Sequence, residues 1–221
     1  MTPESISAPS KPNIRKMILQ SIVGAVCGAI VTYLALQLVE GRGFDLDDPS
    51  RVAALGIGLV FLLMGTIVGL GVVLPGPGAH LLNVEDADEL REQRRPLWRS
   101  ALVILLIGAM MTAFALAPGP DWAGLVSRQV AAIALAVTVV ASTSLSFLGH
   151  KDQDELMRAI AREGSAWGFY ASLAIFVVWG GLAHLGFVTW ITPLGMVSAL
   201  LAIMLAAIFI VCGVRGVLTP R

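Results

Sequence analysis

Charged side chains are scarce in this sequence, and the scarcity limits what kind of protein it encodes. Asp, Glu, Lys and Arg make up 14% of the 221 residues, whereas 57% of the residues are hydrophobic. Soluble domains carry roughly 25% charged residues. None of the long apolar runs has a charged residue near its centre. An apolar excess of this size needs a bilayer as its solvent, so the composition predicts a membrane protein and excludes a soluble domain.

Cysteines are few, and the common catalytic motifs are missing. Cys27 and Cys212 both lie inside apolar runs, whereas a secreted disulfide framework places several cysteines in polar loops. The sequence lacks a His-Glu-x-x-His or Gly-x-Ser-x-Gly motif, and its Gly-rich stretch at 69–78 lacks the Lys-Ser/Thr of a phosphate-binding loop. Basic and acidic residues are equal in number, 15 of each, which indicates no nucleic-acid partner. We therefore expect no catalytic residue, no metal and no cofactor.

Six apolar runs are each long enough to cross the hydrocarbon core of a bilayer, which takes about 20 helical residues. The runs cover residues 17–39, 52–74, 100–117, 130–148, 165–185 and 191–214. The first run, at 23 residues, is too long for the apolar part of a signal peptide. We predict an all-α, polytopic membrane helical bundle of six transmembrane helices at 17–215, flanked by a disordered tail at 1–16 and a short tail at 216–221.

The basic residues are divided unequally between the two sides of this predicted bundle. With six spans, twelve of the fifteen lysines and arginines fall on the side that holds both termini. The other side carries Arg42, Arg51 and Arg128. Loops rich in Lys and Arg stay in the cytoplasm. The sequence therefore predicts that the N- and C-termini are cytoplasmic.

One short word of sequence occurs twice, before the third span and before the fifth. Asp86 begins an Asp-x-Asp-Glu-Leu word, and Asp152 begins the same word 66 residues later. Each copy continues into an Arg-containing segment and then into the next span. Self-similarity at a fixed spacing indicates repeated structure. We predict an internal duplication that relates about 75–148 to 147–215.

The acidic residues of the two words have the spacing of helix caps. The pairs are Asp86 with Glu89 and Asp152 with Glu155, as in a capping box. The pattern predicts a short amphipathic cytoplasmic helix before each span. The alternative is a metal site that each word forms with the nearby His80 or His150, but neither spacing matches a known dense ligand motif. We predict helix caps and no metal ligands.

Two pairs of glycines have the spacing of close helix contacts. Gly24 and Gly28 lie in the first run, and Gly65 and Gly69 lie in the second. Small residues four apart let two helix backbones approach closely, which replaces the missing hydrophobic drive between helices in lipid. We predict that these glycines pack against a partner helix, in this chain or in a second copy.

Hydroxyl side chains cluster near the predicted cytoplasmic end of the fourth span. They are Ser142, Thr143, Ser144 and Ser146. Such residues can line a polar path or hold an anion, but in transmembrane helices they more often bond to a backbone carbonyl or to a neighbouring helix. We favour helix packing.

The segment around the second acidic word resembles a group of small uncharacterised bacterial inner-membrane proteins. The residues that carry the resemblance are Asp154-Glu155-Leu156-Met157-Arg158, Arg162-Glu163 and Trp167-Gly168-Phe169-Tyr170. These proteins place an acidic-then-Arg word before a transmembrane hairpin. The resemblance covers about 20 residues of the chain and implies a bacterial inner membrane and a helical hairpin unit. It implies no activity.

Three classes of function follow. A non-catalytic accessory, assembly or scaffold component of the membrane is favoured by the glycine pairs and by the absence of charge within the spans. Its partners would be the lipid bilayer and another membrane protein or a second copy of the chain. A small channel or carrier of neutral solutes is the second class, and it requires a polar stripe through several spans. A membrane enzyme using the loop carboxylates is the third.

Overall fold

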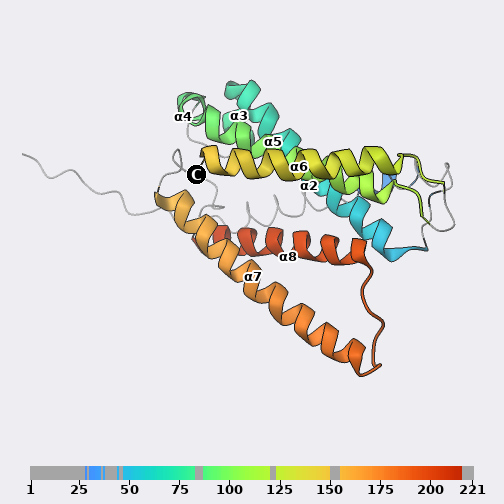
Figure 1. Cartoon of the computed structure of the whole chain (residues 1–221). Helices are drawn as coiled ribbons and strands as arrows, with labels where there is room; N and C mark the ends of the chain where they lie inside the picture. Colours follow the sequence, from blue (N-terminus) through green and yellow to red (C-terminus); the bar gives the residue numbers. More distant parts are fainter. Residues whose placement is uncertain are drawn as a thin grey trace, which may run out of the picture.

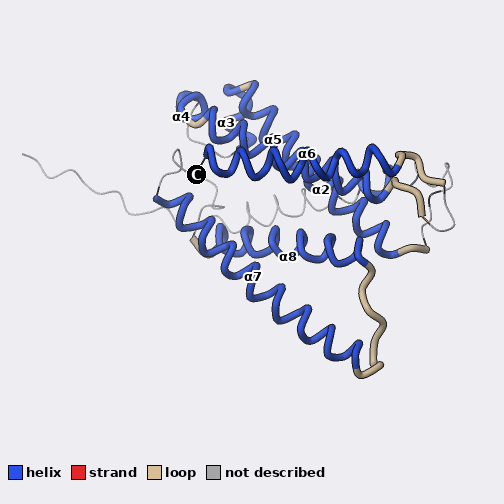
Figure 2. The backbone as a smooth tube through the Cα atoms, viewed as in Figure 1, coloured by secondary structure: helices blue, strands red, loops and turns tan. Residues whose placement is uncertain are grey.

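The computed structural model describes residues 28, 30–35, 37, 44, 47–82, 87–119, 123–149 and 155–215. Throughout these ranges the regular structure is helical, with no strand (Figures 1 and 2). Five helices are long and apolar enough to cross a membrane: α2 (Pro49–Val73), α5 (Arg94–Ala115), α6 (Arg128–Gly149), α7 (Glu155–His184) and α8 (Pro193–Val214). The predicted class, an all-α bundle with several membrane-spanning helices, is therefore confirmed.

The first predicted span lies largely outside the described residues, so the count of six stays a prediction. Within it, residues 30–35 are helical. The side chains of Ile30, Tyr33 and Leu34 are each more than half exposed. The predicted tails at 1–16 and 216–221 also lie outside the described ranges.

Two of the long helices begin with the same local arrangement. Asp48 precedes Pro49 at the start of α2, and its Oδ1 accepts a hydrogen bond from the Ser50 amide at 2.9 Å. Thr192 precedes Pro193 at the start of α8, and its Oγ1 accepts one from the Gly195 amide at 3.0 Å. Proline suits the first helical position because that residue needs no amide donor. The two helix starts also meet, because Thr192 Oγ1 donates to Ser50 Oγ at 2.5 Å.

The second span ends at the predicted place, but the chain does not continue as a loop. After Leu74 the Pro-Gly-Pro-Gly stretch forms the first turn of a further helix, α3 (Pro75–Leu82). Both prolines fall within that first turn, where their missing amides would have no intrahelical partner. Gly78 lies so close to the Gly71 carbonyl that a side chain at 78 would overlap it. This contact holds α3 against the end of α2.

The segments after the two acidic words differ in structure. After the first word, α4 (Ala87–Glu92) ends at a turn on Gln93, and α5 begins anew. After the second word, α7 runs for 30 residues without a break, so the short helix expected before the fifth span is instead the start of α7. Pro96 explains the difference, since its missing backbone donor is tolerated in the first turn of α5 but would break a helix that ran on from α4. The residue 66 positions later is Arg162, which a helix accommodates.

The helices pack around α2, which contacts α5 along most of its length and also contacts α8. Helix α6 packs on α5, and α7 packs on α8. Figure 1 shows that α7 and α8 cross where α7 begins and diverge toward the loop that joins them. A small apolar core lies where the start of α2 meets the end of α5, and its members are Phe44, Ala54, Leu55, Met110, Met111 and Ala115.

Candidate functional site

The closest helix contact in the bundle is the seam between α2 and α5. A Cβ on Gly58 would lie 2.9 Å from the Thr112 backbone nitrogen, and one on Gly108 would lie 2.7 Å from the Leu62 nitrogen. A Cβ on Gly65 would lie 2.7 Å from Leu105 Cγ and 3.0 Å from the Leu105 nitrogen. All four distances are shorter than ordinary van der Waals contact, so only glycine fits these three positions without movement of a helix.

The other glycines of the two predicted pairs are placed differently. Gly69 lies on the same face as Gly65, but a Cβ there would meet Trp98 and Ala101 only at 3.9 and 4.0 Å, which is ordinary contact. Gly28 has nothing within 4 Å of its Cβ position, and Gly24 lies outside the described residues. The prediction missed Gly58 and Gly108, although each has a small residue four positions away, Ala54 and Thr112, and Thr112 lies against Gly58.

A second seam joins α7 to α8, and it also rests on glycines. A Cβ on Gly164 would lie 3.1 Å from Ile208 Cγ1, and one on Gly168 would lie 2.5 Å from the Met204 sulfur. These glycines are four residues apart, the same spacing that singles out Gly65 and Gly69. The sequence therefore carries the same signal at Gly164 and Gly168.

Arg51 is the most buried charged residue in the described part of the chain, with 8% of its surface exposed. Its Nη1 donates to the carbonyl oxygens of Ala115 at 3.1 Å and Ala117 at 2.7 Å. Its Nε lies 3.2 Å from Asp48 Oδ2. The carbonyls at the end of α5 lack helical partners and carry the negative end of the helix dipole. One guanidinium thus joins the start of α2 to the end of α5.

Sequence reasoning had placed Arg51 among the exposed charges of the outer loops. Its position just before an apolar run is equally typical of an arginine whose head lies in the headgroup region. Arg51 differs from such an arginine because residues 115–119, at and after the end of α5, lie against its guanidinium. Gly119 lies directly against the guanidinium, and a side chain there would overlap Nη2.

An ion pair joins α7 to the end of α8, next to the glycines of the α7–α8 seam. Arg215 Nε donates to Glu163 Oε2 at 2.9 Å, and Arg215 Nη2 donates to Glu163 Oε1, so both carboxylate oxygens are engaged. The hydrogen bonds to Glu163 raise the pKa of Arg215 above its ordinary value. Both groups are exposed to solvent, and such pairs add little stability. The pair orients the helix ends more than it holds them.

Four hydroxyl groups within the spans donate to backbone carbonyls. Thr112 donates to the Gly108 carbonyl at 2.8 Å, Ser172 to Gly168 at 2.7 Å and Ser198 to Leu194 at 2.9 Å, each one turn earlier in its own helix. Thr138 on α6 donates to the Leu106 carbonyl of α5 at 3.1 Å. Of the predicted cluster, Thr143, Ser144 and Ser146 are exposed. Ser142 Oγ is buried and, among the described residues, has no hydrogen-bond partner.

Most of the predicted capping and metal-binding residues lie outside the part of the chain that the structure describes. Asp86, Asp152 and His150 are not described, and neither are the side chains of Glu89 and His80. Glu155 is the first residue of α7, where an acidic side chain favours the helix dipole. Within the described ranges no group of three or more His, Cys, Asp or Glu residues has the geometry of a metal site.

The chain matches no family model, no curated protein and no solved structure. The resemblance to small bacterial inner-membrane proteins therefore stays a prediction. Inference about function rests on the geometry of the bundle itself.

Proposed function

We propose that this protein is a non-catalytic component of a bacterial inner membrane that works by binding other membrane proteins, as an accessory, assembly or scaffold subunit. It has six spans, with both termini in the cytoplasm. The proposal is supported by one feature above the others, the separation of α7 from α8 toward the loop between them (Figure 1).

Because of the separation, none of the described helices lies beside the second half of α7. Val177 and Val178 are 63% and 61% exposed, whereas Gly164 and Gly168 in the first half are buried against α8. A hollow of about 480 Å³ lies between α7 and the 185–192 loop, and its lining includes Ile175, Val178 and Val188. Such a gap at membrane depth must be filled by lipid chains or by another helix, because water cannot solvate it. A helix of a partner membrane protein is the occupant that we propose.

The hydrogen bonding of the spans argues against a channel or carrier of neutral solutes. A polar path needs side-chain donors and acceptors that face a shared passage, but four of the intramembrane hydroxyls donate to helix carbonyls. The hollow of about 410 Å³ between α2 and α8 is lined by apolar side chains, among them Ile57, Val60 and Phe209. Such a groove suits lipid chains and offers a polar solute no hydrogen bonds.

The orientation is tested by reporter fusions. A reporter placed after Gly43 is expected outside, and one placed after Gln93 is expected in the cytoplasm. The reason is that the side holding Gln93 and both termini carries most of the basic residues. Reporters that show the same side would overturn the arrangement of six spans.

The binding function is tested by photo-crosslinking in native membranes. A photoreactive amino acid at Val178 is expected to capture a distinct membrane protein, which mass spectrometry would identify. The matched control is Val140, which is 66% exposed on α6 and lines none of the hollows around α7. Capture of lipid alone at both positions would contradict the proposal.

A liposome assay tests the alternative directly. The purified protein is reconstituted, and uptake of small neutral solutes is compared with protein-free liposomes. We expect no difference, since the described spans offer no polar path. Protein-dependent flux, together with no partner captured at Val178, would make the channel or carrier the leading function.

A further inference from the structure

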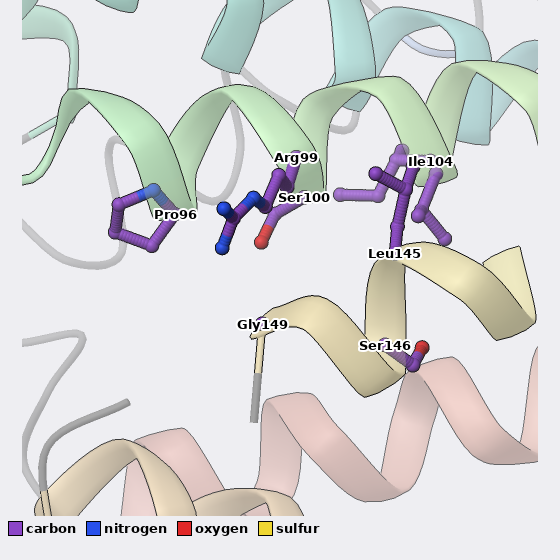
Figure 3. Close-up of a pocket in the computed structure, with 8 residues that line it drawn as sticks. Pro96, Arg99, Ser100, Ile104, Leu145, Ser146 and Gly149 are labelled. Carbon is purple, nitrogen blue, oxygen red and sulfur yellow. The ribbon is translucent and has the colours of Figure 1, made fainter. Parts of the chain in front are cut away.

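The arginine-rich end of the bundle, where α5 and α7 begin and α6 and α8 end, contains a cavity between α5 and α6. Its volume is about 440 Å³, and its lining includes Pro96, Arg99 and Ser100 from α5 and Ser146 and Gly149 from α6. Figure 3 shows that the Arg99 guanidinium and the Ser100 hydroxyl point into the same opening, above Gly149. The cavity thus has a cation and a hydroxyl donor at its mouth.

The interior of the cavity is apolar. Val103 and Ile104, one turn further along α5, and Leu145 on α6 complete the lining. The cavity is thus polar at the helix ends and apolar toward the middle of the spans. A phospholipid has the same order of groups, with its phosphate at the membrane surface and its acyl chains below. The hollow therefore matches a lipid in chemistry as well as in position.

The equivalent place in the second hairpin is closed. The 66-residue offset of the two acidic words relates Leu97 to Glu163 and Gly149 to Arg215. Glu163 and Arg215 form the ion pair that joins α7 to α8. Leu97 and Gly149 have no side chains that can form such a pair, so the α5–α6 hairpin lacks this closure and retains the cavity.

Among the described residues, the charges around the cavity favour an anion. Helix α5 begins Arg94-Arg95-Pro-Leu-Trp-Arg99 and has no acidic residue in its first turn. Arg94 and Arg95 line an adjacent hollow against the end of α2, so the arginines flank α5 on two sides. The first amides of α5 add the positive end of its dipole. The carbonyls that end α6 oppose an anion, but Arg99 Nη1 donates to one of them, Leu148 O, at 3.4 Å.

We propose that the α5–α6 cavity binds the headgroup of an anionic phospholipid, with Arg99 and Ser100 contacting the phosphate and the acyl chains lying along Val103 and Leu145. A guanidinium carries five N–H donors, so it can contact a phosphate oxygen in addition to the Leu148 carbonyl and its other partner. Basic pockets between transmembrane helices are suited to anionic headgroups. The site stands independently of the partner-binding function, since it lies on α5 and α6 and not on α7.

The test is native mass spectrometry of the full chain, delipidated in dodecyl maltoside and titrated with dioleoyl phosphatidylglycerol. We expect one tightly held lipid per chain and weaker binding of dioleoyl phosphatidylcholine, which has the same chains and no net charge. Removing one arginine at a membrane surface weakens anionic lipid binding about fivefold, and we expect that loss for Arg99→Ala.

Two further variants distinguish binding at this site from a general effect of charge, and a melting control excludes misfolding. Arg128→Ala removes the same charge from the opposite end of α6 and should leave lipid binding unchanged. Ser100→Phe fills the opening while keeping Arg99, and it should also displace the lipid. Each variant is first required to melt like the wild-type protein in the absence of lipid, and Arg99→Gln, which also removes the charge, replaces Arg99→Ala if the latter does not.

The results that would overturn the proposal are equally specific. Equal loss in Arg128→Ala and Arg99→Ala would mean that binding follows overall charge. Full occupancy in both Arg99→Ala and Ser100→Phe would place the lipid elsewhere. Displacement of phosphatidylglycerol by inorganic phosphate at equal concentration would identify a free-phosphate site in which the acyl chains contribute nothing.

Discussion

The glycine seam between α2 and α5 makes a prediction that contains its own controls. Gly65→Ala places a Cβ 2.7 Å from Leu105 Cγ and 3.0 Å from the Leu105 backbone nitrogen. The side chain of Leu105 can turn away, but its backbone nitrogen cannot, so α2 and α5 must separate by a few tenths of an ångström. Gly56→Ala, two turns and a half earlier on α2, meets nothing within 4 Å.

The magnitude follows from two opposing effects. Replacing glycine with alanine inside a helix stabilises it by roughly 0.5–1 kcal/mol at both positions. Overpacking a tight contact costs about 1–3 kcal/mol, and only Gly65 incurs that cost. We therefore expect Gly65→Ala to unfold more easily than Gly56→Ala by about 1–3 kcal/mol. Gly69→Ala should resemble Gly56→Ala, because its Cβ makes only ordinary contacts at 3.9 and 4.0 Å.

The assay is a titration of the purified protein with sodium dodecyl sulfate in mixed micelles, followed by far-ultraviolet circular dichroism. The three variants and the wild-type protein are compared for the midpoint and slope of unfolding. Gly65→Leu extends the series, since its larger side chain should widen the gap further. If Gly65→Ala and Gly56→Ala unfold at the same detergent fraction, α2 and α5 are not in backbone contact at residue 65.

Three further predictions concern the remaining contacts. Arg51→Ala leaves Asp48, the buried Ala115 carbonyl and the partly buried Ala117 carbonyl without their guanidinium partner. We expect it to lower the free energy of unfolding by about 2–4 kcal/mol, whereas Arg128→Ala, at an exposed position, should change it by less than about 0.5 kcal/mol. Equal effects would show that Arg51 is solvated. Gly168→Leu should destabilise the protein by about 1–3 kcal/mol, because its side chain overlaps Met204. Gly181→Leu is the control and should not destabilise it, since nothing lies within 4 Å of the Cβ position at 181. Equal melting of the two variants would refute the α7–α8 seam. Calorimetric titration with divalent cations should show no saturable binding, and micromolar binding that Asp88→Ala and Asp154→Ala abolish would instead identify the acidic words as metal ligands.

The arrangement along the chain could be predicted because each span satisfies its backbone hydrogen bonds within itself. A run of apolar residues in lipid has no other way to pair its amides and carbonyls, so length and hydropathy suffice. The second run was predicted at 52–74 and is observed as α2 at Pro49–Val73. The remaining error is the first turn, where the Asp48 cap and Pro49 begin the helix before its apolar residues start.

Which helix faces which depends on contacts between distant residues, and only the tertiary structure decided it. The spacing of the glycines predicted that Gly65 is a contact residue. That its neighbour is Leu105 depends on the path of the chain through α3 and α4. The same holds for Arg51, whose burial follows from carbonyls more than 60 residues away. Pro96 stands in the sequence, but only the structure shows its effect: a new helix, α5, begins around it, whereas α7 continues without a break at the equivalent place. Local hydrogen bonding determines the spans, whereas close packing between them requires shapes that no local pattern specifies.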